Sequence, residues 1–535
     1  MPEALWYQPH DTILSPFLRL PYDVHHMFLR MLIVALTDPD PYVPWDGYRD
    51  LLNLMSTCKT MRRFMLGTPK LWRYITVNDF TPNTISRIQE YLSERSKGVK
   101  LFVALNLHGR HNQDSPVHAL EEVCDILSPH LHRVQSFLAS GLTVDQTSVI
   151  ARLFKGDAKF RSSCLETLAL IAREEGGAEG DIHLYSKTFP CLCLLEGPSR
   201  TRCIEASLHK NSLTRLSLDF GMVDRAALDS IYGMLRECPN MEQLSLQEYY
   251  QQTTADDLSV GSVALPRLKQ LTITATEPSA TRHLLTTIAY PPTVAISVSW
   301  DILYDSPYDW IPLDSPSFND IRFSVARMEV DIKHEQDQGD PLLLLGWRAH
   351  MKNSEKPSLD VAWGIIHPEG KVGDYINDDM LSYFLNVGTL TTTVGAGVRV
   401  GHYRHLMADD WLCILTGFLR LTEWNIEVPV EDCAEVTHEI CHAIAEFAAS
   451  PCLQSIRFRI TEGPPATEAS VATLHELLHY LTERLTARPE RVLRQFFVDP
   501  RWIDSDLTMR KLQALEQLGM VVESLESECS QGETE

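Results

Sequence analysis

The amino-acid sequence predicts an α/β protein in which short parallel strands alternate with helices along most of the 535 residues. Two observations carry this prediction. A short apolar motif returns at near-constant spacing, and the segments between its copies carry apolar residues at helical spacing. The composition, with 44% hydrophobic and 22% charged residues, is that of a globular protein. At this length, several domains or a repeat array are expected rather than one compact core.

The clearest copy of the motif is Leu213-Thr-Arg-Leu216-Ser-Leu218. Its last two apolar residues are two apart, so they face the same side of a strand. Six runs of this form start at residues 165, 189, 213, 241, 268 and 293, which gives spacings of 24, 24, 28, 27 and 25. Because one such unit cannot bury its apolar face alone, the spacing predicts stacked units, as in a leucine-rich-repeat solenoid. A set of unrelated strands in an α/β domain is the alternative.

Further runs of the same form indicate that the array continues, and they begin at Phe318, Leu421, Leu453 and Leu493. Residues 299–420 are less regular. We expect irregular repeats with long insertions there, among them a polar loop from Lys333 to Pro341. The solenoid-like region is therefore predicted over residues 81–522, followed by an acidic, disordered tail over residues 523–535.

The connecting segments predict helices. Between residues 218 and 241, the apolar residues Val223, Ala227, Leu228, Ile231 and Leu235 recur at helical spacing, and Cys238-Pro239-Asn240 ends the pattern. Similar patterns predict helices near residues 85–92 and 120–127. They also predict a strand over residues 101–107 and a strand start near residues 131–134. This alternation is what a repeat with one strand and one helix requires.

The N-terminal region predicts a small helical module. Residues 1–17 form an irregular leader, and residues 18–76 carry two helical patterns. Pro21 opens the first helix, as proline does in a first turn. The second pattern ends at Gly67-Thr-Pro69, which is a helix stop signal.

This module resembles the F-box of F-box proteins from mushroom-forming (basidiomycete) fungi. The matching features are Leu20-Pro21 at a helix start, a leucine- and cysteine-rich helix, and the ending Thr68-Pro69-Lys-Leu71-Trp72. The sequence departs from the pattern at Ser56 and Met61, and a polar insertion around Pro41 and Pro44 separates the helices. By the motif match, the residues expected in the F-box helices and the adaptor contact are Leu20, Pro21, Val24, Phe28, Leu54, Cys58, Leu71 and Trp72.

The resemblance implies a substrate-receptor subunit of an SCF-type ubiquitin ligase, with the F-box on the Skp-family adaptor and the repeats on a target protein. Such a protein is not itself an enzyme and needs no cofactor. Two alternatives stay open. The chain can be an F-box-like, leucine-rich-repeat interaction scaffold without a ligase role. The N-terminal helices can also serve only as a cap on the array, since terminal repeats need their open core end covered.

Charge and composition narrow the partners and the compartment. The formal net charge is −23, which disfavours nucleic acid and anionic membranes as general partners. No apolar stretch approaches the ~20 residues that span a bilayer, and the first residues lack the pattern of a signal peptide. The twelve cysteines lack a disulfide-framework spacing. We therefore expect free thiols and an intracellular protein, cytoplasmic or nuclear.

Two His-Glu-x-x-His stretches could carry chemistry, because histidines four apart on a helix can bind one zinc while the glutamate activates water. The candidate ligands are His438 and His442, and His475 and His479. A zinc peptidase is therefore a third alternative. A third ligand from a separate element is not evident, so we expect no metal here and expect Ile440 and Leu478 to pack inward. The glycines from Gly395 to Gly401 depart from phosphate-loop spacing and predict a turn.

Overall fold

A computed structural model of the chain describes part of its length, which divides into two compact units, residues 1–203 and 204–535. The described residues are 53, 55–56, 59–107, 117–154, 164–172, 189–198, 212–219, 222–223, 225–251, 261–275, 278–300, 311–312, 314–337, 340–352, 354, 358–365, 384, 386–394, 408–418, 420–428, 439–440, 443, 452–460, 472, 475, 478–479, 481–483, 486, 494–498, 506–518 and 520–524.

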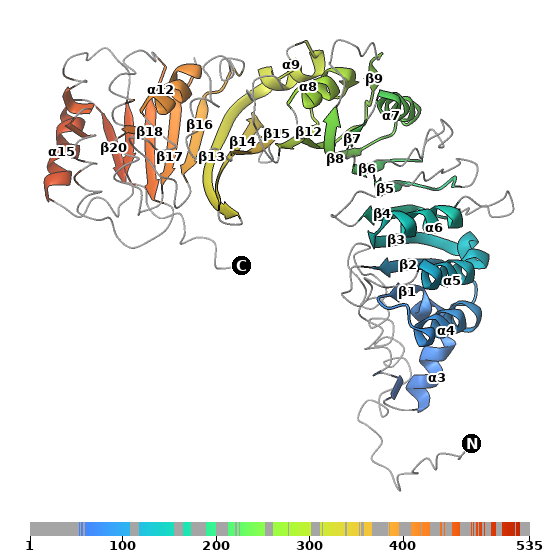
Figure 1. Ribbon diagram of the computed structural model, residues 1–535. Helices are drawn as coiled ribbons and strands as arrows, with labels where there is room; N and C mark the ends of the chain where they lie inside the picture. The colour runs from blue at the N-terminus through green and yellow to red at the C-terminus, as the bar shows by residue number, and fades with distance from the viewer. Residues whose placement is uncertain are drawn as a thin grey trace, which may run out of the picture. The chain divides into compact units, whose positions relative to one another are not determined.

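The first unit contains a parallel sheet whose strands pair in the order of the chain (Figure 1). Its strands are β1 (Tyr74–Val77), β2 (Leu101–Asn106), β3 (Val134–Leu142), β4 (Thr167–Ala172) and β5 (Leu194–Pro198). The α-helices are α3 (Lys59–Gly67), α4 (Pro82–Glu90), α5 (Val117–Leu127) and α6 (Val144–Phe154). Three short helical turns are η2 (Pro69–Trp72), η3 (Tyr91–Arg95) and η5 (Ser128–Arg133).

Alternating side chains explain why these segments form strands. In β2, Leu101, Val103 and Leu105 are buried while the residues between them are half-buried. Successive strand residues point to opposite faces, so one apolar face supplies the core. A guanidinium completes the packing: the buried Arg133 donates to the backbone oxygens of Ser96 at 3.0 Å and Leu92 at 2.6 Å, where η3 ends. It thereby adds hydrogen bonds to carbonyl groups at the end of a helical turn, where intrahelical donors run out.

The second unit is built on a large, mostly parallel sheet. Its strands are β6 (Arg215–Asp219), β7 (Met222–Val223), β8 (Gln243–Gln251), β9 (Val263–Ala264), β10 (Gln270–Ala275), β11 (Ile288–Ala289), β12 (Ala295–Trp300), β13 (Val325–Asp337), β14 (Asp340–Met351), β15 (Leu359–Ile365), β16 (Thr389–Val394), β17 (Glu423–Val428), β18 (Ser455–Ile460), β19 (Gln495–Val498) and β20 (Val521–Ser524). Its helices are α7 (Arg225–Glu237), α8 (Pro278–Thr287), α9 (Pro316–Ser324), α12 (Ala408–Gly417) and α15 (Asp506–Gln517).

The strand order in the second unit departs from the chain order at one place. The sheet runs β6-β8-β10-β12, then β15-β14-β13, then β16-β17-β18-β19-β20. The three strands β13, β14 and β15 thus lie in reverse order, and β14 is antiparallel to both neighbours. The short β7 extends the pairing of β8, and β9 pairs with β11 in a separate small sheet.

The helices of the second unit pack on one face of this sheet (Figure 1). Trp411 of α12 lies against Trp424 of β17 with ring centroids 6.1 Å apart. Trp300 of β12 donates its Nε1 proton to Thr281 Oγ1 of α8 at 3.3 Å. These tryptophans are all buried. The core therefore lies between the helices and one sheet face, and the residues between the buried ones point to the other face.

Most of the strands and helices that the sequence predicts are present. The motif residues Leu216, Leu244, Leu271, Ile296 and Trp424 are buried in β6, β8, β10, β12 and β17. The helices predicted between residues 218 and 241 and near residues 85–92 and 120–127 are α7, α4 and α5. The chain is thus an α/β protein with a mostly parallel sheet.

Three local predictions are wrong. The run that starts at Phe189 is displaced by three residues, because Leu195 rather than Leu192 pairs with Leu168. The run at Phe318 is a helix, α9: Ser315 caps it by accepting from the Phe318 N–H at 3.4 Å, and Pro316 occupies the first turn.

The third error is the predicted loop from Lys333 to Pro341. Its residues belong instead to the antiparallel hairpin of β13 and β14, and Asp337 pairs with Asp340 at the end of the hairpin. At the other end of the chain, β20 continues to Ser524, so residues 523 and 524 of the segment expected to be a tail form part of a strand.

Candidate functional site: a polar row on the sheet face opposite the described helices

One continuous row of side chains crosses the second unit's sheet on the face opposite the helices. The strand registers align one residue from each strand across the sheet. In sheet order, this central row is Ser217, Ser245, Thr272, Ser297, Asp360, Arg348, Glu329, Thr391, Asn425, Arg457 and Phe497. From Ser217 to Arg457 every member is half-buried, whereas its neighbours in the same strand are mostly buried in the core.

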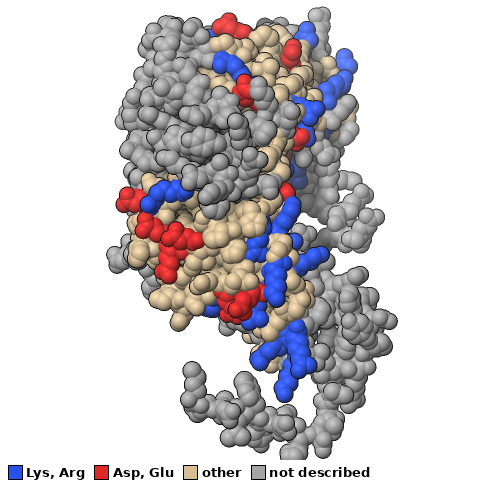
Figure 2. Space-filling model, turned by 90° about the vertical axis from the view of Figure 1, so that its right-hand side faces the viewer, with Lys and Arg blue, Asp and Glu red and all other residues tan. Residues whose placement is uncertain are grey.

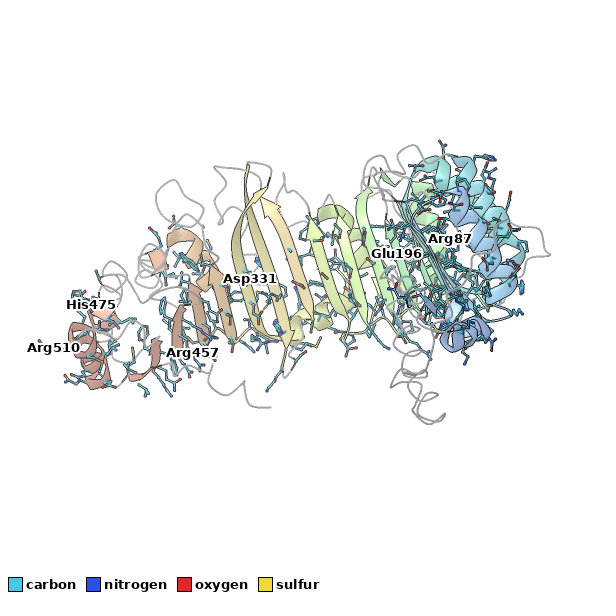
Figure 3. All side chains as sticks on the ribbon, turned by 90° about the horizontal axis from the view of Figure 1, so that it is seen from below. Arg87, Glu196, Asp331, Arg457, His475 and Arg510 are labelled. Atoms are coloured by element: carbon cyan, nitrogen blue, oxygen red, sulfur yellow. The ribbon has the colours of Figure 1, made fainter. Side chains whose placement is uncertain are left out.

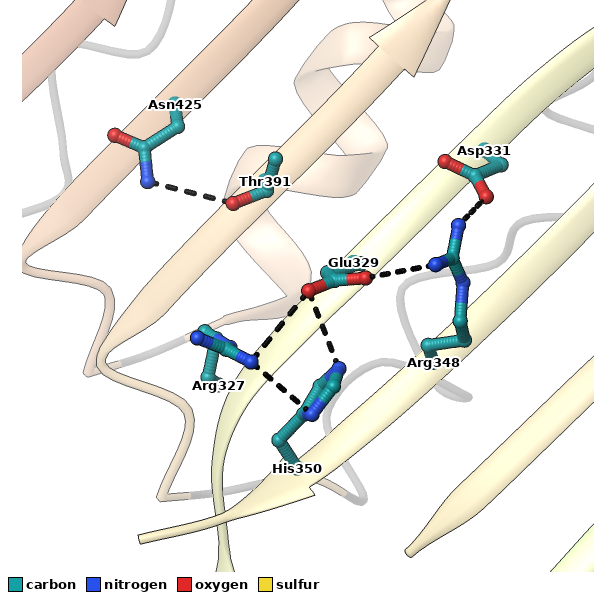
Figure 4. Close-up of polar contacts among 7 residues, drawn as sticks. All are labelled: Arg327, Glu329, Asp331, Arg348, His350, Thr391 and Asn425. Atoms are coloured by element: carbon teal, nitrogen blue, oxygen red, sulfur yellow. Dashed lines mark hydrogen bonds and ion pairs between the residues drawn. The ribbon is translucent and has the colours of Figure 1, made fainter. Parts of the chain in front are cut away.

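The middle of the row is an ionic cluster on β13 and β14 (Figure 4). The Glu329 carboxylate lies close to three basic groups: Arg348 Nη1 at 3.3 Å, His350 Nε2 at 3.2 Å and Arg327 Nη2 at 3.6 Å. Arg348 also binds Asp331 through Nη2. Antiparallel pairing places Glu329 directly opposite Arg348 and Arg327 directly opposite His350. His350 is therefore diagonal to Glu329, and Asp331 is diagonal to Arg348. The cluster therefore depends on the hairpin.

His350 is the most buried member of this cluster. Only 3% of the residue is exposed. Burial lowers the pKa of its imidazole, because the charged form loses hydration. The Glu329 carboxylate acts in the opposite direction, and Arg327, whose Nη2 lies 3.1 Å from His350 Nδ1, lowers the pKa further. The neutral imidazole is consequently the favoured form near neutral pH.

The same packing shifts the pKa values of Asp360 and Arg348. Asp360 of β15 pairs with Arg348 of β14. Burial raises the pKa of Asp360, and the positive charge of Arg348 partly offsets this increase. Burial would lower the pKa of Arg348, but the hydrogen bond and charge of Asp331 and the charge of Glu329 outweigh it and raise the pKa. Arg348 is therefore a permanent cation held by acidic groups from both neighbouring strands.

From β16 to β18, polar and then charged side chains form cross-strand pairs. Asn425 Nδ2 donates to Thr391 Oγ1 at 3.3 Å. On β18, Arg457 Nε lies 3.2 Å from Glu423 Oε1, and its guanidinium carbon is 4.4 Å from the ring centroid of Phe497. Arg459 Nη1 lies 3.8 Å from Glu427 Oε1. Both arginines thus point across the strands on the same face as the row.

The other side of the ionic cluster has a different character. From β6 to β12, the row consists of Ser217, Ser245, Thr272 and Ser297. A parallel row beside it pairs Thr274 with Ser299, whose hydroxyl oxygens are 3.0 Å apart. These side chains are short, polar and uncharged. The charged side chains of the row begin with Asp360 on β15.

The predicted adaptor-contact residues are only partly described. Leu20, Pro21, Val24, Phe28, Leu54 and Cys58 lie outside the described residues. Leu71 and Trp72 are described in η2, and both are buried. Trp72 donates its Nε1 proton to the Met65 oxygen at 2.9 Å, and its ring centroid is 5.1 Å from that of Tyr91. These two side chains therefore belong to the packing of the first unit.

The surface beside this packing is basic. Lys59, Arg62 and Arg63 of α3 and Lys70 of η2 are all exposed. Figure 2 shows Lys and Arg side chains gathered at the lower end of the described surface, with acidic side chains higher up. Against the formal net charge of −23 for the whole chain, this is a local excess of positive charge.

The second His-Glu-x-x-His stretch is partly described, whereas His438 and His442 lie outside the described residues. His475 Nε2 lies 2.7 Å from Thr508 Oγ1 of α15, and Lys511 donates to the His475 backbone oxygen at 2.8 Å. His479 instead faces Glu483, with Nε2 3.5 Å from Oε1. Ile440 and Leu478 are fully buried, as expected from the sequence.

No group of three metal-binding side chains occurs within the described residues. Burial and the nearby Lys511 lower the pKa of His475. In Figure 3, His475 lies beside α15, the helix that carries Arg510, away from Asp331 of the ionic cluster.

The segment from Gly395 to Gly401 lies outside the described residues. Each described cysteine carries a thiol, and Cys193 donates its thiol proton to the Cys191 oxygen at 3.2 Å.

Comparison with known proteins gives no assignment: no protein-family model matches the sequence, and neither does any curated protein. Among the described residues, no helix is both long enough and apolar enough to cross a membrane.

Proposed function

We propose that the chain is a substrate-receptor subunit of an SCF-type ubiquitin ligase, acting inside the cell in the cytoplasm or nucleus. Its N-terminal module, residues 18–76, would be an F-box that docks on the Skp-family adaptor. The strands and helices from residue 81 onward would be a leucine-rich-repeat solenoid that holds a target protein. The motif match of residues 20–72 supports the first part, and the spacing of the buried motif leucines supports the second.

The observation that carries the proposal is the continuous central row. Stacked strands that leave one face without helices present a broad surface on which each strand contributes one side chain at the same level. The row changes from hydroxyls to an ionic cluster and then to arginine–glutamate pairs. Such variation along a regular scaffold favours recognition of one extended partner surface over the binding of a small molecule.

In this role the chain makes and breaks no bond. Holding the target and the adaptor on one chain raises the effective concentration of the target near the ubiquitin-charged enzyme. The chemistry would belong to that enzyme, and the receptor would contribute position. The proposed contact residues Leu20, Pro21 and Phe28 would secure the adaptor, while the row would secure the target.

The first experiment is co-expression of the full chain with a fungal Skp-family adaptor, followed by size-exclusion chromatography. The proposal predicts a stable one-to-one complex. The double variant Pro21→Ala/Phe28→Ala should lose the complex while its circular-dichroism spectrum stays unchanged. Arg87→Ala, on the exposed side of α4, is the matched control and should keep the complex. A folded wild-type chain that forms no complex would refute adaptor docking.

One observation favours a second candidate, an interaction scaffold whose N-terminal helices only cap the array. Leu71 and Trp72 are buried within the chain, and η2 leads directly into β1, which pairs with β2 of the repeat-like sheet. A cap would be packed in this way, because the open end of a stack needs covering. The scaffold predicts that deletion of residues 1–58 impairs folding of the first unit and that no adaptor complex forms.

A further inference from the structure

The arginines of the polar face are consistently more accessible than the carboxylates that hold them. The Arg348 side chain is 40% exposed, against 23% for Glu329 and 12% for Asp331. Arg457 is 42% exposed over Glu423 at 29%, and Arg459 is 51% exposed over Glu427 at 29%. Arg327, at 42%, repeats the pattern over Glu329. An approaching partner therefore meets guanidinium groups first.

The exposed arginines can each bind a second anion while they stay paired with a resident carboxylate. An arginine carries five N–H donors in a planar fork, so it can bind one carboxylate from the side and present other donors to a second. The ion-pair contact of Arg457 uses Nε, and that of Arg459 uses Nη1 alone. Each of these ion pairs therefore engages one nitrogen of the guanidinium, and the other N–H donors of the same fork can bind a second anion.

The arginines stand in two groups at a spacing that fits an extended chain. Arg327 and Arg348 lie on β13 and β14, and Thr391 and Asn425 lie on the next two strands (Figure 4). Arg457 and Arg459 lie on β18, the strand after these. Figure 3 labels Arg457. Strands lie about 4.8 Å apart, so β14 and β18 are separated by roughly 19 Å. An extended peptide covers that distance in about six residues. The amide and hydroxyl groups between can bind its backbone.

We infer that the face from β14 to β18 binds an acidic peptide segment, with aspartate or glutamate side chains placed about six residues apart. This inference rests on the proposed role of the row as the target-binding surface, and it does not depend on adaptor docking. The accessible charges of the face complement such a segment. Because the resident carboxylates nearly balance the arginines, recognition depends on short-range hydrogen bonds more than on long-range attraction.

The direct test measures the binding of a fluorescein-labelled peptide to the full chain by fluorescence anisotropy. The peptide Glu-Glu-Ser-Gly-Ser-Gly-Glu-Glu carries two acidic pairs six residues apart. Matched peptides carry glutamine or lysine in place of every glutamate. The inference predicts saturable binding of the acidic peptide and binding at least about tenfold weaker for the glutamine peptide, since several charge-assisted contacts are lost. Equal binding, or preference for the lysine peptide, would overturn it.

Three variants locate the site. Arg457→Gln/Arg459→Gln should weaken binding about tenfold or more, because it removes one of the two arginine groups. Arg510→Gln removes an exposed arginine from α15 on the helical side, and it should leave binding unchanged. Glu427→Gln should strengthen binding about twofold, because it frees Arg459 for the peptide. If these arginines only stabilised the fold, Glu427→Gln would weaken peptide binding instead of strengthening it.

The outcomes separate this inference from the proposed function. An unchanged affinity of Arg457→Gln/Arg459→Gln, or a weaker affinity of Glu427→Gln, would refute the acidic-peptide site even if the adaptor complex forms. A failed adaptor complex would refute ligase docking even if the peptide binds as expected. Circular-dichroism spectra and thermal midpoints of each variant, compared with Arg510→Gln, verify that the chain remains folded.

Discussion

Neutralising Glu329 should destabilise the second unit more than neutralising any other carboxylate of the polar face. Glu329 is the one described carboxylate that contacts Arg327, Arg348 and His350 together, at 3.2 to 3.6 Å. In Glu329→Gln these groups lose their shared anion. Breaking a fully buried pair costs about 3–5 kcal/mol, whereas an exposed pair is worth about 0–1 kcal/mol. At 23% exposure, Glu329 lies between these limits, and we expect a loss of about 2 kcal/mol.

The matched control is Glu427→Gln on the same face. Glu427 makes one contact, at 3.8 Å, with an arginine that is 51% exposed. Its neutralisation should therefore cost about 0.5 kcal/mol or less. Urea denaturation followed by tryptophan fluorescence measures both, because Trp347 lies on β14 beside Arg348. Equal losses for the two variants would refute the argument that the hairpin cluster is a coupled network.

The same variant has a pH signature. The pKa of His350 is lower in the folded chain than the ordinary histidine pKa of about 6.5. At pH values between these two pKa values, His350 is protonated in the unfolded chain but neutral in the folded chain. Stability therefore falls as the pH decreases from about 6.5. Glu329 raises this pKa, so Glu329→Gln lowers it further and should steepen the loss between pH 8 and 5.5, by at most about 1.4 kcal/mol. An identical pH dependence of the variant and the wild type would contradict this.

Three further stability predictions follow from the packing. Trp424→Ala removes a fully buried ring and its hydrogen bond to Thr392, and thermal denaturation should show a loss of about 3–5 kcal/mol; a loss near 1 kcal/mol would contradict the packing described. Ser315→Ala removes the cap of α9 and should cost about 1 kcal/mol in urea denaturation, more than the exposed Ser324→Ala; equal costs would argue against the cap. Arg133→Met removes the buried hydrogen bonds to the Leu92 and Ser96 carbonyls and should cost about 2 kcal/mol, with faster limited proteolysis around η3; unchanged proteolysis would contradict it.

Much of the sheet follows from local sequence. Leu216, Leu244 and Leu271 occupy equivalent, buried positions because the motif places one apolar side chain of each strand toward the helices. The run at Phe318 has the same spacing of apolar residues, yet it forms a helix. There the capping Ser315 and Pro316 decide the outcome, and residues three apart also share a helix face. Motif spacing alone does not separate the two structures.

The candidate site could not be predicted in the same way. Arg327, Glu329 and Asp331 alternate with Met328 and Val330, a period of two that indicates a strand with one polar face. That signal was present in the segment leading into the predicted loop. The partners Arg348 and His350 reach Glu329 only through antiparallel pairing in a hairpin, and the reversal of β13, β14 and β15 then places this hairpin inside a parallel sheet. No periodicity of the sequence encodes that order.

The measurement that tests the central claim most directly is hydrogen–deuterium exchange of the full chain with and without a Skp-family adaptor. If the chain is a ligase receptor, adaptor binding should slow exchange in peptides from residues 18–76 and leave the central row from Ser217 to Phe497 unchanged, available to a target. Unchanged exchange over residues 18–76 in a folded chain, or protection confined to the central row, would contradict the account.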